Sequence, residues 1–179
     1  MVLGQSHSTV SIYFALVCTT SPLLGVLFGG KLVDFYGGYT SPKALKICLW
    51  FSALTCLTAI PLPFFDSFPS FVALLWLCLF FGACLIPPLT GILISSSPKQ
   101  LRPIAASFAQ IINNLFGYLP SPIVYGIVIE FTGGGTSRWG MGLLSGWTGF
   151  SFVFLYLALR YQKSSLISRQ KRLNEIELI

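Results

Sequence analysis

Long apolar runs separated by short polar loops dominate the chain. About 20 apolar residues are enough for a helix to cross the hydrocarbon core of a bilayer. Five runs reach that length, and we expect helices at about residues 10–30, 47–65, 68–95, 103–129 and 140–159, followed by a polar cytoplasmic tail at 160–179. The pattern therefore predicts an all-α membrane protein, a five-span helical bundle in a single domain.

The composition favours a protein that dissolves in lipid rather than in water. Of the 179 residues, 54% are hydrophobic and 9% are charged, whereas a soluble domain carries about 25% charged residues. The net charge of +6 comes from cations at the ends of the apolar runs. Because they form no basic patch mixed with aromatic residues, we expect the lipid bilayer as a partner and no nucleic acid.

The cations lie unevenly on the two sides of the membrane that five spans define. One side carries Lys31, Lys43, Lys46, Lys99, Arg102, Arg160, Lys163, Arg169, Lys171 and Arg172. The other side carries only Arg138. Because positively charged loops stay in the cytoplasm, we expect the N-terminus outside or in a lumen and the C-terminus in the cytoplasm.

Three amides interrupt the fourth apolar run near its middle, at Gln110, Asn113 and Asn114, and Ser121 follows. A helix in hydrocarbon must satisfy such side chains against protein or a water-filled cavity. Two interpretations are open. The amides can form hydrogen bonds to a neighbouring helix, or they can line a path for a solute.

Proline pairs predict breaks in two of the spans. Pro87 and Pro88 interrupt the third span, and Pro120 and Pro122 interrupt the fourth. Proline lacks a backbone N–H and its ring crowds the preceding turn, so it kinks or breaks a helix. We therefore expect bent helices or pairs of half-helices, which transporters use to build binding sites.

Nothing in the sequence is typical of catalysis or of metal binding. The chain has a single histidine, its five cysteines form no CxxC pair, and it offers no Ser/His/Asp set within the apolar runs. Metal sites and nucleophilic catalysis need such groups close together. We expect no enzyme activity, no catalytic residue, no metal and no cofactor.

The loop after the first span carries a motif, G-x-x-x-D-x-x-G, at Gly30, Asp34 and Gly37. It resembles the cytoplasmic loop motif of major facilitator superfamily transporters, where the loop helps to latch the two halves of the protein in one state. At the positions where the family motif usually has basic residues, this chain has Phe35, Gly38 and Tyr39. Asp34 can act in such a latch or, near a helix N-terminus, as a cap for free amides.

A second resemblance covers residues 115–130, LFGYLPSPIVYGIVIE, together with Arg102. This stretch is similar to the eleventh helix of the Spinster transporters of lysolipids and sphingolipids, and to organic-anion-transporting polypeptides. The latter usually carry a cysteine-rich external domain, which the short loop at 61–67 lacks, so we prefer the Spinster-like interpretation. It implies helices eight to twelve, part of the C-terminal half of the major facilitator fold. Arg102 is then a gate contact, whereas by its position alone it is an interfacial anchor.

We therefore expect a transporter that moves an amphipathic small molecule or lipid by alternating access. Its path would be lined by Gln110, Asn113, Asn114 and Ser121. The five spans amount to less than half of such a transporter, so we expect a fragment that needs the missing N-terminal half and does not transport alone. The alternative is a non-transporting multi-pass scaffold or a relic of a transporter.

Overall fold

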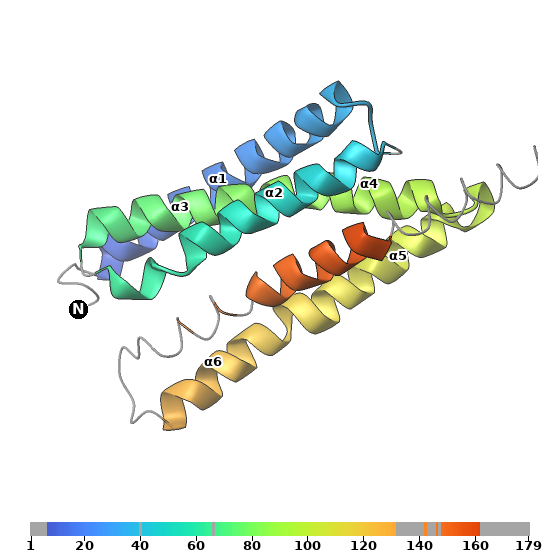
Figure 1. The fold of residues 1–179 in the computed structure, drawn as a ribbon. Coiled ribbons are helices and arrows are strands. Elements are labelled where there is room, and N and C mark those ends of the chain that lie inside the picture. Colours follow the sequence, from blue (N-terminus) through green and yellow to red (C-terminus); the bar gives the residue numbers. More distant parts are fainter. Residues whose placement is uncertain are drawn as a thin grey trace, which may run out of the picture.

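The computed structural model describes residues 7–39, 41–65, 67–131, 142, 146 and 148–161. These residues are helical apart from short joints and contain no β-strand. In chain order the elements are α1 (His7–Phe35), α2 (Pro42–Ala59), the 3-10 turn η1 (Leu62–Phe64), α3 (Phe68–Cys84), α4 (Ile86–Ser96), the 3-10 turn η2 (Lys99–Leu101), α5 (Arg102–Ile112), the π-helical turn η3 (Asn113–Tyr118), α6 (Pro120–Phe131) and a last helix (Thr148–Tyr161) (Figure 1).

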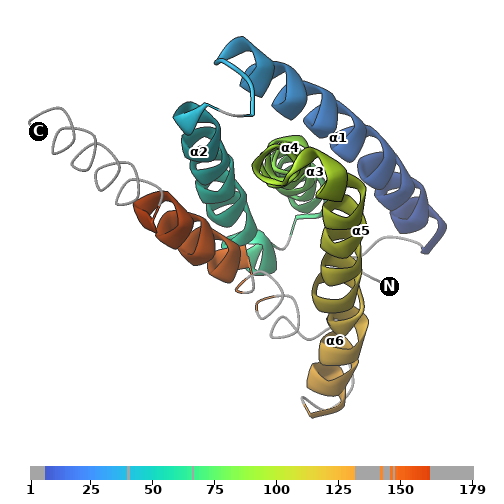
Figure 2. The same ribbon diagram turned by 90° about the vertical axis from the view of Figure 1, so that its right-hand side faces the viewer.

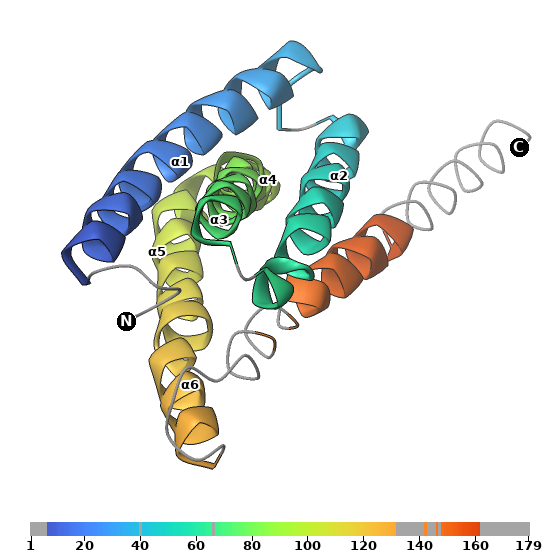
Figure 3. The same ribbon diagram turned by 90° about the vertical axis from the view of Figure 1, so that its left-hand side faces the viewer.

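The centre of the bundle is the pair α3 and α4, which α1, α2 and α5 flank (Figure 2). Both α1 and α2 pack along α3, and α5 packs against α4. The last helix covers α2, where Leu155 joins a buried cluster that includes Leu45, Cys48 and Phe51. Figure 3 shows α6 continuing from α5 away from α1 and α2.

Three of the helical stretches, Ser8–Phe35, Lys43–Phe64 and Phe68–Ser96, are long and apolar enough to cross a membrane. The fourth expected span is divided among α5, η3 and α6. For the fifth, the structure describes an apolar helix at Thr148–Tyr161, and most of residues 140–147 lie outside the described residues. The all-α membrane fold is confirmed, and the division into five spans stays a prediction.

Small residues on α1 bring it into close contact with α3. Ser21, Gly25 and Gly29 are spaced four apart and therefore share one face of the helix. A Cβ added at Gly25 would lie 2.5 Å from the carbonyl oxygen of Phe80. The buried Ser21 donates a hydrogen bond from its Oγ to the carbonyl of Trp76 at 2.7 Å. Membrane helices associate through this kind of close packing, because lipid tails are as apolar as leucine.

The third expected span divides into α3 and α4 at Leu85. The N–H of Leu85 bonds to the carbonyl of Gly82 at 3.2 Å, a tighter turn than an α-helix makes. Pro87 and Pro88 then occupy the first turn of α4, where a missing N–H costs nothing. Because Pro88 is fully buried in the bundle, the bend is held by packing as well as by the proline rings.

The fourth expected span widens into a π-helix directly before Pro120. Within it the N–H of Leu119 bonds to the carbonyl of Asn114, five residues earlier, at 3.0 Å. Pro120 has no N–H, and a proline ring collides with the carbonyl four residues before it. A wider turn relieves that collision, which explains why the irregular segment precedes the proline rather than following it.

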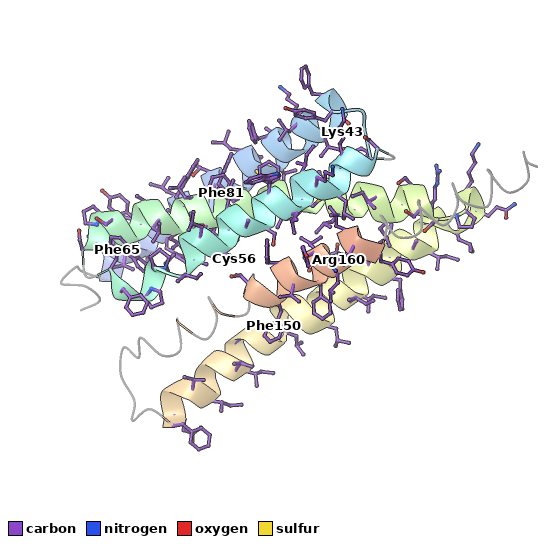
Figure 4. All side chains as sticks on the ribbon, in the orientation of Figure 1. Lys43, Cys56, Phe65, Phe81, Phe150 and Arg160 are labelled. Carbon is purple, nitrogen blue, oxygen red and sulfur yellow. The ribbon has the colours of Figure 1, made fainter. Side chains whose placement is uncertain are left out.

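Large apolar side chains cover the outer faces of the bundle (Figure 4). Phe14 on α1, Trp50 on α2, Phe108 on α5 and Phe150 on the last helix are each more than half exposed. Exposed apolar surface on every side is unfavourable in water and is what a bilayer requires. The distribution agrees with an integral membrane protein.

Candidate functional site

A half-open pocket of about 340 Å³ lies where α4 and α5 face each other. Its α3 and α4 wall is made of Gly82, Leu85, Ile86, Leu89, Thr90 and Leu93. Its other wall is made of Ala106, Ala109, Gln110 and Asn113. The pocket is therefore mainly apolar, with one hydroxyl and two amides among its lining groups.

Helix α5, together with the first residues of η3 that continue it, has two chemically different faces. The lining residues Ala106, Gln110 and Asn113 recur three or four positions apart and share a face. The opposite face carries the exposed apolar side chains of Ile104, Phe108, Ile111 and Leu115. The small and polar face thus meets α4 while the apolar face points outward, as expected for a lipid-contacting helix that borders a path.

Two of the three predicted path amides, Gln110 and Asn114, interact with each other, and Asn114 is not among the residues that line the pocket. Nε2 of Gln110 donates to Oδ1 of Asn114 at 3.4 Å, one helical turn away. No hydrogen bond from a described residue of another helix reaches Gln110, Asn113 or Asn114, and all three side chains are exposed. The described residues therefore do not show the interhelical hydrogen bonds that we considered, and the amide of Asn113 is available to a ligand.

The expected gate residue, Arg102, and the last expected path residue, Ser121, lie on different helices. Arg102 begins α5 with an exposed side chain, four residues before Ala106, and so extends the pocket-facing side of the helix to its end. Ser121 is the second residue of α6, and its side chain lies outside the described part of the structure. Its role in the path stays a prediction.

The loop motif terminates α1 through its glycines. The N–H of Gly38 bonds to the carbonyl of Val33 at 3.0 Å, and the N–H of Gly37 bonds to the carbonyl of Asp34 at 3.3 Å. This crossed pair closes the helix, and it requires a left-handed residue after the last turn. Gly37 with φ of 105° and Gly38 with φ of 76° supply that conformation.

The expectation that Asp34 caps a helix N-terminus is wrong. Asp34 lies in the last turn of α1, where the helix dipole disfavours a carboxylate. The N-cap of α2 is instead Ser41, whose Oγ accepts from the N–H of Lys43 at 3.3 Å. Of the two roles considered for Asp34, the latch stays a prediction.

Sequence reasoning missed a contact between the motif loop and α4. The ring of Tyr39 lies against Gly91, where an added Cβ would be 2.5 Å from Cγ and 2.7 Å from Cε1 of that ring. The neighbouring Thr90, which lines the pocket, was missed as well. It is the one polar side chain in residues 85–94, and this signal could have identified it.

A second and larger groove, of about 720 Å³, lies between α1 and α3. Its walls include Tyr13, Phe68 and Trp76, and the indole N–H of Trp76 already donates to Oγ1 of Thr20 at 3.1 Å. Trp76 also stacks on Phe80, with ring centroids 5.3 Å apart. With its indole donor engaged, this groove lacks the free amides that make the smaller pocket the candidate site.

Comparison with known proteins identifies the family. A family model described as the Major Facilitator Superfamily matches residues 2–177. No curated protein and no solved structure matches the chain, and the likeness to Spinster transporters and organic-anion-transporting polypeptides stays a prediction. The family match covers nearly all of the sequence, and three helices among the described residues are long and apolar enough to cross a membrane. The chain therefore belongs to the major facilitator superfamily of membrane transporters.

Proposed function

We propose that the chain forms one side of the path of a secondary transporter that moves an amphipathic small molecule or lipid by alternating access. The observation that carries this proposal is the pocket between α4 and α5. There Thr90, Gln110 and Asn113 face a mainly apolar cavity, while the opposite side of α5 is apolar and exposed. Small-molecule sites combine an apolar lining with a few polar groups in this way.

The irregular backbone of both lining spans supports a moving path. One wall bends at Leu85 and the other widens at Asn113–Tyr118. Turns that leave the α-helical pattern are points at which a membrane helix can bend, and π-helical turns are frequent at functional sites. We propose that α4 and α5 move relative to each other at these two places when the path opens and closes.

A second group of helices is expected to complete the path. The pocket is half-open, and the amides of Gln110 and Asn113 are exposed. In a bilayer such amides need protein or water beside them. We propose that the N-terminal half of a major facilitator transporter covers this side, as the resemblance of the loop motif at Gly30, Asp34 and Gly37 implies.

The orientation is proposed from the cations. The ends of α1 and α4 and the starts of α2 and α5 lie toward one end of the bundle (Figure 1). Lys31, Lys43, Lys99 and Arg102 belong to these ends. The positive-inside rule assigns that end to the cytoplasm and the start of α1 to the outside or a lumen.

The proposal is tested by editing the gene in cells that make the protein, so that any partner is present. We expect the Asn113→Leu/Asn114→Leu variant to reduce transport of at least one labelled single-chain amphiphile about fivefold, since Asn113 lines the pocket and one lost polar contact is worth about 1 kcal/mol. Gln100→Leu, which removes an exposed amide outside the pocket, is the matched control. Unchanged transport of every amphiphile in the double variant would remove these amides from the path and contradict the proposal.

A further inference from the structure

We infer that the pocket between α4 and α5 selects an uncharged hydrogen-bonding group, such as a hydroxyl, carbonyl or amide, attached to an apolar body, and disfavours a net-charged head group. The inference rests on the proposed function, because it specifies the solute class of that same site. Amphipathic solutes include cations, anions and neutral molecules, and the inference adds that the lining of this pocket distinguishes among them by charge.

The described lining of the pocket offers no ionic partner to a charged solute. None of the described residues that line the pocket carries a charge, and the whole of residues 68–96, which include one wall, lacks Asp, Glu, Lys and Arg. On the α5 wall the charged residue is Arg102, eight positions before Gln110. At 1.5 Å per residue the backbone positions lie about 12 Å apart along the helix axis. An ion held at the amides would therefore lose its hydration without gaining a counter-charge, which is unfavourable.

The pocket contains hydrogen-bonding groups that no described residue engages. In this bundle the hydroxyls of Thr19, Thr20, Thr55 and Thr58 donate to carbonyls of their own helices. The hydroxyl of Thr90 makes no hydrogen bond to any described residue, and the same is true of the amide of Asn113. Thr90 and Asn113 come from the two walls of one pocket, so one bound ligand has a free hydrogen-bonding group on either side.

The polar side chains of the pocket offer both hydrogen-bond donors and hydrogen-bond acceptors. Gln110 uses one amide N–H for Asn114, which leaves its carbonyl oxygen and a second N–H. An asparagine amide offers a carbonyl acceptor and two donors, and a threonine hydroxyl can act in either sense. A hydroxyl or amide group, which both donates and accepts, matches this set better than a carboxylate, which only accepts, or an ammonium, which only donates.

The test uses the full chain together with any partner that accompanies it, in native nanodiscs cut from the membranes of cells that make the protein, and three amphiphiles with one decyl chain. The heads are neutral in N-decylacetamide, anionic in decyl sulfate and cationic in decyltrimethylammonium. Each competes against a diazirine-bearing decylacetamide, and labelling is quantified on the peptide that contains residues 106–113. Concentrations are corrected for the measured partitioning of each competitor into the same nanodiscs.

We expect the neutral competitor to be about tenfold more potent than either ion, because burying an unpaired charge costs more than burying a bonded amide. Thr90→Val and Asn113→Leu should each weaken the neutral competitor about fivefold, as expected for one lost hydrogen bond. Gln100→Leu should leave it unchanged. Asn113→Asp, which is nearly isosteric, should move the preference toward the cationic competitor.

The outcomes separate the two proposals. If an ionic amphiphile competes as well as the neutral one, and Asn113→Leu reduces its potency, the inferred preference for uncharged groups is contradicted. The pocket would then still be a site for a solute. Labelling that neither Asn113→Leu nor Thr90→Val changes, in variants whose circular dichroism and melting match the parent protein, contradicts the proposed function itself. If Thr90→Val fails to fold, the preference of the Asn113→Asp variant decides the inference alone.

Discussion

Replacing Gly29 with alanine tests the closest contact between α1 and α3. A Cβ at Gly29 would lie 2.8 Å from the Cα and 2.9 Å from the carbonyl carbon of Cys84, and closer still to its carbonyl oxygen. Carbon atoms in contact prefer separations of about 3.5–4.0 Å. Because the obstructing atoms belong to the backbone of α3, no side-chain rotation relieves the clash, and the two helices must separate by roughly 1 Å.

The expected magnitude follows from two opposing terms. Overpacking of this kind costs about 1–3 kcal/mol, and replacing glycine by alanine within a helix returns up to about 1 kcal/mol. Gly29→Ala should therefore lower the free energy of unfolding by about 1–2 kcal/mol. Gly30→Ala is the matched control, since the nearest atom to its added Cβ is the Cβ of Pro87 at 3.8 Å, an ordinary contact. It should be neutral or slightly stabilising.

The assay is reversible unfolding of the purified protein in mixed micelles with a rising fraction of dodecyl sulfate, followed by circular dichroism. The free energies of the two variants are compared with that of the parent protein under identical conditions. If Gly29→Ala and Gly30→Ala change the stability equally, α1 and α3 do not approach each other at Gly29, and the account of the small-residue interface is refuted.

Two further predictions concern contacts between parts of the bundle, and a third concerns the orientation of the chain in the membrane. Gly91→Ala should lower the free energy of unfolding by about 1 kcal/mol, because the added methyl group displaces the ring of Tyr39. In a Tyr39→Ala background most of this loss should disappear, which a double-mutant cycle of unfolding free energies measures. Additive effects of the two substitutions would contradict the contact. Ser21→Ala should cost about 0.6–1 kcal/mol by removing the hydrogen bond to α3, measured by the same unfolding assay, whereas Ser21→Thr with no loss of stability would contradict its tight burial. In sealed right-side-out vesicles of protein without native cysteines, a membrane-impermeant maleimide should label Phe65→Cys and not Gln100→Cys; the reverse labelling would invert the proposed orientation.

The apolar pattern predicted the helices well and their ends poorly, for a physical reason. Apolar runs mark the part of a helix that lies in hydrocarbon, so the first span was expected to stop near residue 30. In the structure α1 continues to Phe35, because nothing in residues 31–36 breaks a helix before the left-handed Gly37 and Gly38. The error placed Asp34 at the start of a helix when it lies at the end of one.

The candidate site was predicted in part. The amides and the break near Pro120 could be read from the fourth apolar run, because polar groups and prolines are conspicuous among apolar residues. Thr90 and Tyr39 could not be connected to it, since the pairing of α4 with α5 depends on the bend at Leu85 and the direction it gives to α4. The seating of Tyr39 on Gly91 likewise depends on how the loop leaves α1.

The central claim is that one face of α5 borders a water-accessible path and the other borders lipid. The measurement that tests it most directly is the reaction rate of single cysteines with a water-soluble methanethiosulfonate, in protein whose five native cysteines are replaced by alanine. The Asn113→Cys variant should react readily and be slowed by a bound amphiphile, and Ile111→Cys on the opposite face should react at least about tenfold more slowly, because a thiol in hydrocarbon does not ionise. Faster reaction at position 111 than at position 113 would contradict the account.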